Sequence, residues 1–256
     1  LIRGEVRVKP ETWGGDFVIA RSKTDPIFHL AVVVDDNAMQ ISHVIRGEDH
    51  VVNTARHVLI QRALGIESPQ YAHLPLLLNE NRGKLSKRAG DTDLLAYKDK
   101  AIIPEAMLNY LALLGWSPKT NEEIFSREEL IKRFDLANVQ KAGAIFSLRK
   151  LISVNRVYVK HQAPAALLAD ATPFLTAANY DLSETAYWEA AVALEQDRLD
   201  SAAELPGLLA YMKPEWGAEY EPELLIWKKS DAVATGKRLT QAMDIIKLWS
   251  NSKPFS

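Results

Sequence analysis

The chain has 256 residues, of which 47% are hydrophobic and 25% charged, as is ordinary for a globular protein with room for more than one domain. It contains no cysteine, which excludes disulfides, thiolate zinc sites and cysteine nucleophiles and agrees with a reducing cytoplasm. The longest apolar runs, such as AVVV and PLLL, are far shorter than the roughly 20 residues of a membrane span, so we expect no membrane partner.

The net charge of −2 hides an uneven distribution along the chain. Residues 127–160 carry eight Lys/Arg against three Asp/Glu, a net of +5, and residues 161–227 carry two against twelve, a net of −10. Residues 228–256 return to a net of +4, six against two. The total argues weakly against a nucleic-acid partner, whereas the basic segment leaves room for a local face that contacts phosphates.

The first part of the chain contains a predicted hairpin, a predicted strand and a segment whose type is ambiguous. Residues 1–22 predict a β-hairpin, with turn chemistry at Gly14-Gly15-Asp16, and FVIAR at 17–21 favours a strand. The apolar stretch HLAVVVDDNAMQ that follows shows no clear alternation, so its type stays ambiguous.

A strand–helix–strand pattern follows. Residues 41–50 predict a short buried strand that ends at Arg46-Gly47, and residues 51–65 show helical spacing of apolar residues, with Gly65 as a stop. Residues 71–79, YAHLPLLLN, predict another strand. The pattern indicates a βαβ unit in a mostly parallel sheet, where ligands bind beyond the carboxyl ends of the strands. The segments RGEDH and GKLSKR both lie just past such ends, so we expect them to face one crevice.

From about residue 92 the pattern is helical. Pro104 suits a first helical turn, and Gly115 suits the end of the same helix. Ser126 followed by Glu129 is a capping box. Residues 160–256 predict helices joined by turns that contain Pro and Gly. The predicted fold class is therefore α/β followed by all-α.

The loop GKLSKRAGD, residues 83–91, is the densest cationic stretch between two regular elements. It is either a solvated turn or a loop that clamps the phosphates of ATP. It is not a Walker loop, because Leu78 and Leu85 stand where that motif needs Gly and Ser or Thr. Lys84 and Lys87 can approach phosphates from one side and stabilise the negative charge that builds on a departing pyrophosphate, while Ser86 can donate a hydrogen bond.

Together with VIRGEDHVVNTARHVLIQRALG upstream and IPEAMLNYLALLGWSP downstream, this loop closely resembles bacterial glutamyl-tRNA synthetase, a class I synthetase. KLSKR occupies the place of that class's KMSKS signature. Residues 124–160 resemble the segment that contacts the tRNA stem and leads to the anticodon-binding helices. The resemblance is detailed over about residues 1–160 and looser beyond.

The resemblance implies the second half of a Rossmann-type catalytic domain followed by helical tRNA-binding regions. The implied regions are the end of an acceptor-binding insertion (1–22), the half catalytic domain (23–100), a stem-contact region (101–160) and part of an anticodon-binding domain (161–256).

Residue roles follow from the same resemblance. Lys87 would be the main ATP phosphate contact, with Lys84 assisting and Ser86 between them, and Arg46 would pair with the substrate glutamate. A guanidinium fork binds a carboxylate bidentately, although a structural ion pair of Arg46 with Glu48 or Asp49 is the alternative. The remaining implied contacts are Glu48, Asp49 and His50 near the ribose and adenine, Leu77 against the adenine, Phe28 in the glutamate pocket, and Lys141, Arg149, Lys150 and Arg156 on tRNA.

The implied reaction joins ATP and glutamate to glutamyl-adenylate and transfers the glutamyl group to tRNA(Glu). Magnesium would accompany ATP, and positioning with charge stabilisation would supply most of the catalysis. The family is cytoplasmic and usually monomeric. The sequence leaves open whether tRNA(Gln) is charged as well.

The chain also departs from the family pattern. Phe28 stands where the family usually has tyrosine, so it can shape the pocket but cannot donate that hydroxyl's hydrogen bond. No stretch matches the family's HIGH signature, and we expect both it and the zinc-binding cysteines of some members to precede Leu1, so that this chain holds no zinc site. The last part of the anticodon-binding region would follow Ser256.

Three alternatives remain open. A truncated relative that glutamylates a modified tRNA base lacks the helical half, which the residues after His161 argue against. Glutaminyl-tRNA synthetase has a similar loop, but VIRGEDHVVNTARH fits the glutamyl type better. A non-catalytic tRNA-binding paralogue is opposed by intact Lys84, Lys87 and Arg46 and mildly favoured by Phe28. Filter binding compared with pyrophosphate exchange, on the full-length protein, separates the paralogue from an enzyme.

We predict that residues 1–256 alone catalyse no glutamate-dependent pyrophosphate exchange, because half of the implied ATP site would precede Leu1. The measurement is exchange of labelled pyrophosphate into ATP with and without glutamate. Exchange above background that requires glutamate would contradict the prediction.

Overall fold

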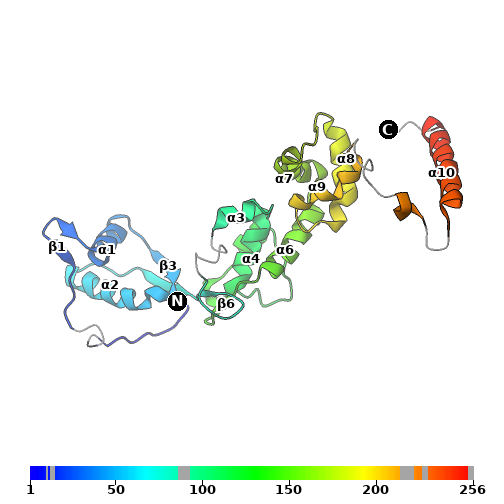
Figure 1. Ribbon diagram of the computed structural model, residues 1–256. Helices are drawn as coiled ribbons and strands as arrows, with labels where there is room; N and C mark the ends of the chain where they lie inside the picture. Colours follow the sequence, from blue (N-terminus) through cyan, green and yellow to red (C-terminus); the bar gives the residue numbers. More distant parts are fainter. Residues whose placement is uncertain (10, 12–14, 86–92, 214–221, 227–229, 253–256) are drawn as a thin grey trace. The chain divides into compact units, whose positions relative to one another are not determined.

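The computed structural model describes residues 1–9, 11, 15–85, 93–213, 222–226 and 230–252 (Figure 1). Residues 1–206 and 207–256 form two compact units. The order of elements, strands and helices first and helices alone later, confirms the predicted fold class. The domain limits predicted at residues 22, 100 and 160 stay predictions.

The first strands form a small antiparallel pair, β1 (Ala20–Ser22) with β2 (Asp25–Pro26). The predicted hairpin over residues 1–22 is not found, because the described residues before Ala20 form no strand, and residues 12–14 lie outside the described residues. The turn lies instead between the two short strands. There the backbone N–H of Thr24 donates to Ser22 Oγ (3.3 Å), and Arg21 forms an ion pair with Asp25.

The predicted βαβ unit is confirmed. Strand β3 (His43–Gly47) leads through a 3₁₀ turn at Glu48–His50 into α2 (Val51–Leu64) and back to β4 (Gln70–Leu74), which pairs with β3 in parallel. Gly65 caps the C-terminal end of α2. Its φ is +68°, a left-handed conformation that glycine adopts without strain. The ambiguous stretch after Pro26 is the helix α1 (Phe28–Ala38), which packs against α2.

The stretch YAHLPLLLN contains two strands, not the single strand predicted. Pro75 has no N–H to donate to a ladder, so β4 ends at Leu74 and the chain changes partner. The backbone N–H of Leu76 donates to Glu48 Oε1 (3.2 Å). β5 (Leu77–Leu78) then pairs in parallel with β6 (Ala144–Ile145), so the strand that leads into the cationic loop is paired with a segment much further along the chain.

The helical part of the first unit begins with α3 (Leu94–Lys98), α4 (Pro104–Gly115), α5 (Arg127–Arg133) and α6 (Leu148–His161). Pro104 occupies the first turn of α4, as predicted, and both hydrogen bonds of the Ser126–Glu129 capping box are present before α5. Gly115 is the last residue of α4, and Trp116 takes the cap position that the sequence had suggested for Gly115.

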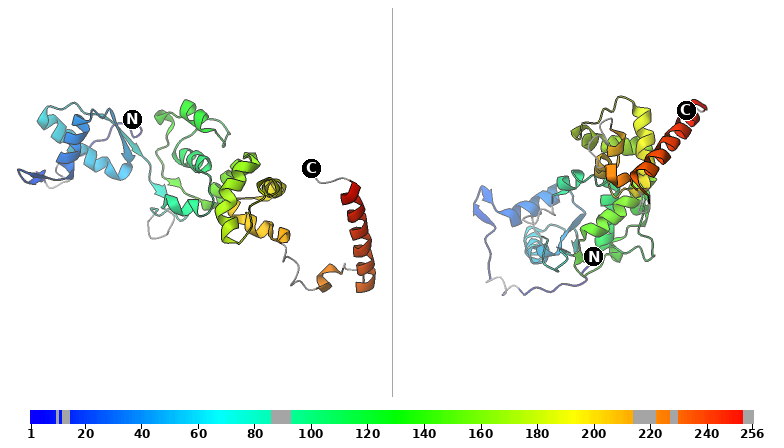
Figure 2. Two further views of the ribbon diagram at one scale, coloured as in Figure 1. Left: turned by 90° about the horizontal axis from the view of Figure 1, so that it is seen from above. Right: turned by 45° about the vertical axis from the view of Figure 1, so that its right-hand side comes forward.

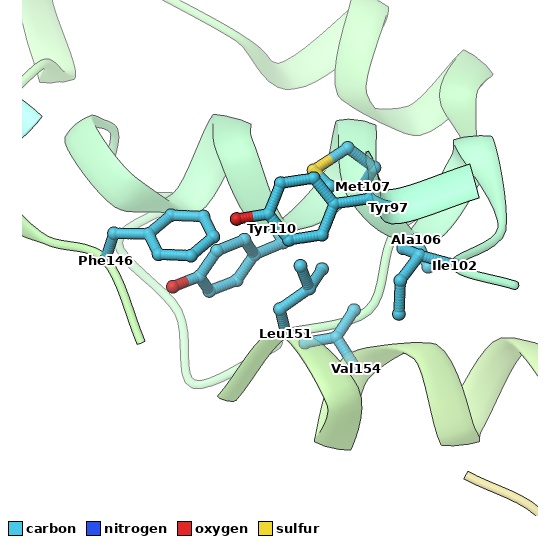
Figure 3. Packing of buried hydrophobic residues seen from close by; sticks show 8 residues of the cluster. All are labelled: Tyr97, Ile102, Ala106, Met107, Tyr110, Phe146, Leu151 and Val154. Atoms are coloured by element: carbon cyan, nitrogen blue, oxygen red, sulfur yellow. The ribbon is translucent and has the colours of Figure 1, made fainter. Parts of the chain in front are cut away.

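One hydrophobic cluster joins α3, α4 and α6 (Figure 3). The rings of Tyr110 and Phe146 meet edge to face at 5.4 Å, and the Tyr110 hydroxyl accepts from the backbone N–H of Ser147 (2.7 Å) and donates to its carbonyl (3.0 Å). The apolar ring is therefore buried while its polar tip stays hydrogen-bonded. The cluster consists of Tyr97, Ile102, Ala106, Met107, Tyr110, Phe146, Leu151 and Val154.

A second cluster connects the small parallel sheet to the helices. Ala72 of β4 packs in the same buried group as Trp116, at the end of α4, and Phe125, just before α5. Further along, α7 (Pro164–Ala177) packs against α8 (Thr185–Glu195), and α9 (Leu205–Leu208) is short. The second unit contains α10 (Ala232–Ser252), drawn in orange to red in both views of Figure 2.

We predict that Asn155→Ala lowers the free energy of unfolding by about 2–3 kcal/mol, because three partly buried backbone groups lose a partner. Asn155 is fully buried in α6; its Oδ1 accepts from the N–H of Ile103 (2.8 Å), and its Nδ2 donates to the carbonyls of Asp200 (2.8 Å) and Ala101 (3.4 Å). Urea unfolding followed by tryptophan fluorescence measures the change. Asn37→Ala, at an exposed position in α1, is the control and should change it by less than about 0.5 kcal/mol.

Candidate functional site

Arg46 lies at the carboxyl end of β3, where α2 and β4 surround its guanidinium. Nη2 donates to Thr54 Oγ1 at 2.6 Å and lies 3.5 Å from both the carbonyl of His50 and Nδ1 of His57. The guanidinium carbon stands 5.7 Å from the centre of the Tyr71 ring, a cation–π arrangement. Nε is buried and has no hydrogen-bond partner among the residues that the structure describes.

The two carboxylates that follow Arg46 in the sequence do not neutralise it. Glu48 forms an ion pair with Arg3, and Asp49 forms one with Lys84. Within the described part of the chain, no carboxylate lies at ion-pair distance from Arg46. The alternative of a structural ion pair between Arg46 and Glu48 or Asp49 is therefore wrong. The charge of Asp36 works to raise the pKa of Arg46, but burial outweighs it and lowers that pKa. The guanidinium therefore has no ion-pair partner in the described chain and can attract an anion from outside.

Three histidines beside Arg46, His57, His29 and His73, are neutral at pH 7. Burial, followed by the charge of Arg46, lowers the pKa of His57 to about 4. Burial is also the largest cause of the lowered pKa of His29 and His73, and it lowers the pKa of Arg46 itself without removing its proton near neutrality. The guanidinium thus keeps its charge beside imidazoles that carry none.

Lys84, at the start of the cationic loop, lies close to the same strand end. A tight turn presents it: the backbone N–H of Asn79 donates to the Gly83 carbonyl (2.8 Å), and the N–H of Gly83 donates to Asn79 Oδ1 (2.8 Å). Leu78 and Lys84 form an isolated antiparallel β-bridge. Nζ of Lys84 lies 3.4 Å from Oδ2 of Asp49. Slight desolvation works to raise the pKa of Asp49, but the hydrogen bond and charge of Lys84 outweigh it and lower that pKa.

The pair between Lys84 and Asp49 joins the RGED segment to the start of the GKLSKR segment, as the sequence predicts for one crevice. Lys87 and Ser86 lie outside the described residues. Their predicted roles in ATP binding stay predictions.

Four further residues were predicted for the substrate pocket, and the structure describes the surroundings of each. Leu77 is 38% exposed at the start of β5, and His50 contacts the Asn53 amide through Nδ1 (3.2 Å). Phe28 is 54% exposed, and its ring lies 5.9 Å from the ring of His57. Glu48 is engaged by Arg3 and by the backbone, so its predicted contact with ATP stays a prediction.

The residues predicted to contact tRNA are all exposed. Arg149 and Lys150 lie in the first turn of α6, where the helix dipole disfavours cations. Nζ of Lys150 lies 2.5 Å from Glu123, and Arg156 lies 3.5 Å from Asp200. Lys141 precedes β6 and Arg149 has no ion-pair partner in the described chain. Arg149 and Arg156 share a face of α6 with Ser153 and Lys160.

Sequence reasoning missed the residues that hold Arg46. Thr54 and His57 follow His50 at intervals of four and three residues, which places all three on one face of α2 and its preceding turn. That spacing, next to an arginine at a strand end, is the signal that could have found them. His29 lies on α1, and the sequence contains no local signal for its contact with His57.

Two other kinds of site are not formed by the residues that the structure describes. No helix among them combines the length and apolarity that crossing a membrane requires. No group of three His, Asp or Glu side chains among them is arranged to hold a metal ion.

The sequence model of one protein family, described as tRNA synthetases class I (E and Q), catalytic domain, matches residues 1–153. This chain belongs to that family. The resemblance of the KLSKR and VIRGED segments to a class I synthetase is thereby confirmed, and the half Rossmann-type unit β3–α2–β4 is the family's fold in this chain.

Individual relatives agree with the family. The chain is 44% identical over 233 residues to a glutamate–tRNA ligase of Aquifex aeolicus, covering 90% of this chain and 48% of that protein. It is 46% identical over 215 residues to one of Picosynechococcus, covering 80% and 44%. This chain thus spans about half the length of the curated relatives that it matches.

Solved structures of this synthetase family share the fold. A glutamate–tRNA ligase of Elizabethkingia meningosepticum in complex with its amino acid superposes with a TM-score of 0.72 at 34% identity, covering 84% of this chain and 49% of that one. A glutamate–tRNA synthetase of Elizabethkingia anophelis gives a TM-score of 0.77 at 30% identity, covering 100% and 56%.

We predict that the free energy of unfolding falls as the pH drops from about 6.5 to about 4 and that His57 carries a large share of the fall. His57 has a pKa of about 4 when folded and 6.5 when unfolded, so the unfolded chain binds more protons in this window. The share is on the order of 1–3 kcal/mol, and the lowered pKa values of His29 and His73 add to the fall with the same sign.

Urea unfolding at several pH values measures this dependence, and an NMR titration of the histidine ring protons measures the pKa of His57 directly. His57→Gln removes the titrating group and should flatten the dependence. Equal slopes in both proteins, together with a His57 pKa near 6.5, would contradict the prediction.

Proposed function

We propose that this chain is the part of a glutamate–tRNA ligase that holds the substrate glutamate and the phosphates of ATP and contacts tRNA(Glu). The reaction joins ATP and glutamate to glutamyl-adenylate with release of pyrophosphate, and the glutamyl group then passes to tRNA. The family, the names of its relatives and the Arg46 guanidinium, which has no ion-pair partner in the described chain, support this proposal.

Arg46 is the observation that carries the proposal. Its Nη2 edge is held by Thr54 over the Tyr71 ring, and the surrounding histidines are neutral, so the guanidinium keeps its full attraction for a carboxylate. Glutamate offers such a carboxylate. A lysine would supply the charge but not the planar fork, so the site is suited to arginine.

Lys84 supports the second half of the proposal, the contact with ATP. It stands on a tight turn 3.4 Å from Asp49, exposed enough to exchange that carboxylate for a phosphate. Lys84 and Lys87 would stabilise the charge that develops on pyrophosphate as the glutamate carboxylate attacks the α-phosphate, with Ser86 between them as a hydrogen-bond donor. Mg²⁺ would arrive with ATP as part of the substrate.

The exposed cations of α6 support a contact with tRNA. Two positive side chains in the first turn of a helix oppose its dipole, and an external phosphate would relieve that cost. Arg149, Lys150 and Arg156, with Lys141 before β6, would contact the sugar–phosphate backbone and position the tRNA without reading its sequence.

We predict that Arg46→Gln lowers kcat/KM for glutamate in pyrophosphate exchange by roughly 30- to 1000-fold, because it removes one partner of a half-buried charge pair. The assay uses a chimaera in which this chain replaces the aligned part of the Aquifex aeolicus relative. Arg46→Lys should restore only part of the loss, since it returns the charge without the fork.

Arg62→Gln is the matched control, an exposed arginine on α2 that should leave exchange unchanged. Filter binding of tRNA(Glu) should be the same for all three variants. If Arg46→Gln exchanges as fast as the unaltered chimaera, the proposal fails. If the unaltered chimaera binds tRNA but exchanges no pyrophosphate, the chain is a tRNA-binding paralogue.

A further inference from the structure

One face of α6 carries a stripe of exposed polar and positive side chains. Arg149, Ser153, Arg156 and Lys160 recur at intervals of four, three and four residues, which places them on one side of the helix, whereas the side chains opposite are buried. Arg149 and Lys160 lie about 16 Å apart along the helix axis. The small Ser153 lets an extended polyanion lie close between the cations. The stripe therefore suits a sugar–phosphate backbone.

Two carboxylates from a later part of the chain already contact this stripe. Nη1 of Arg156 lies 3.5 Å from Oδ1 of Asp200, and Nζ of Lys160 lies 2.9 Å from Oδ1 of Asp197. Arg149, at the other end of the stripe, has no ion-pair partner in the described chain. Carboxylates of the protein itself thus pair with the C-terminal half of the stripe and leave its N-terminal end open.

The turn that carries the two carboxylates is fixed to α6. The Gln196 amide donates to the carbonyls of Val159 (2.8 Å) and Gln162 (2.7 Å) at the C-terminal end of the helix. The fully buried Asn155 amide donates to the carbonyl of Asp200 (2.8 Å). Because the backbone is held at both ends of this turn, its carboxylates stay in place. The cations of the stripe have to turn away from them to bind another anion.

We infer that Asp197 and Asp200 are internal competitors for the phosphates of RNA and weaken the binding of a polyanion to α6. Their carboxylates accept the same charge-assisted hydrogen bonds that phosphate oxygens accept. Exposed ion pairs are weak, so an external phosphate can displace them, but each displacement lowers the affinity by up to about five-fold. Arg149 breaks no ion pair and binds a phosphate without that loss.

The charge pattern of the sequence offers a second way in which acidic residues could act on RNA. Residues 127–160 carry a net charge of +5, and residues 161–227 carry a net charge of −10. A long-range repulsion by the acidic segment would act through all of its carboxylates and is screened beyond about 10 Å at 0.1 M salt. Competition by contact acts instead on two particular cations, so variants distinguish the two effects.

Competition of this kind sets a threshold for binding. It lowers the affinity for every polyanion that needs the stripe by a similar factor. A short single strand that contacts the stripe alone then binds weakly, whereas a folded RNA with further contacts on the protein keeps enough affinity to stay bound. For a glutamate–tRNA ligase that RNA is tRNA(Glu). This last step rests on the proposed function, whereas the competition concerns any phosphate backbone.

The test measures the binding of a fluorescent oligouridine of about 20 nucleotides to the 256-residue chain over a series of salt concentrations. At about 50 mM NaCl we expect Asp200→Asn to bind roughly two- to five-fold more tightly than the unaltered chain. Its plot of log K against log[salt] should be steeper by up to about 0.7, the slope of one phosphate contact on a single strand. Asp197→Asn should behave in the same way.

Glu184→Gln is the matched control. It removes the same charge from an exposed position in the acidic segment, and Glu184 has no ion pair in the described chain. We expect it to change the affinity by less than about two-fold. Circular dichroism should show the same helix content in all variants, because each substitution is at the surface. Equal gains in Asp200→Asn and Glu184→Gln would overturn the inference, since the effect would then be net charge alone.

A double-mutant cycle shows whether the gain comes from the contact itself. Arg156→Gln added to Asp200→Asn should remove the gain, because the cation that Asp200→Asn releases is then absent. Arg156→Gln in the unaltered chain should weaken binding by a smaller factor. A gain that survives Arg156→Gln would also overturn the inference.

The same assay with tRNA(Glu) separates this inference from the proposed function. If Asp197→Asn and Asp200→Asn gain affinity for the oligouridine but the chain binds tRNA(Glu) no better, the inference stands and the proposed contact with tRNA(Glu) fails. If tRNA(Glu) binds more tightly than the oligouridine but neither variant gains, the inference is wrong and the proposed contact stands. If no variant binds either RNA, the inference is wrong as well, while exchange by Arg46→Gln still tests the ligase proposal.

Discussion

A half-buried guanidinium with no ion-pair partner in the described chain is the constraint around which the end of β3, α2 and β4 are arranged. Desolvating a charge costs several kcal/mol unless polar partners replace water. For Arg46 those partners are the Thr54 hydroxyl, the face of Tyr71 and uncharged imidazoles, each of which stabilises the cation without neutralising it. The protein therefore accepts a cost in stability to keep the charge available, which is typical of a binding site.

The backbone keeps the nearby carboxylates away from that charge. The 3₁₀ turn after β3 directs Glu48 toward Arg3 and the N–H of Leu76, and Asp49 toward Lys84. Gly47 makes this possible, because a Cβ on it would lie 2.6 Å from Asp49 Oδ1. Pro75 ends β4 and lets β5 pair with β6, which brings Lys84 within reach of Asp49. Local turn chemistry thus decides which charges meet.

The features of the fold that are local in sequence could be predicted from it. The Gly65 stop, Pro104 in the first turn of α4 and the Ser126–Glu129 capping box each depend on residues within one or two turns of each other. The break of YAHLPLLLN into two strands could not, because β5 finds its partner more than 60 residues further on. The type of the element at α1 was ambiguous from the sequence because its valines favour a strand. In the structure the segment is a helix that packs against α2.

The same distinction applies to the candidate site. Arg46 and Lys84 could be found because each belongs to a short segment with a chemical meaning of its own, and their nearness follows from the parallel βαβ rule. The partners of Arg46 lie on elements that are separate in the sequence: Thr54 and His57 on α2, and Tyr71 on β4. No short segment encodes which of these side chains reach the guanidinium, because the packing of α2 and β4 against β3 brings them together. This part of the site therefore had to come from the structure.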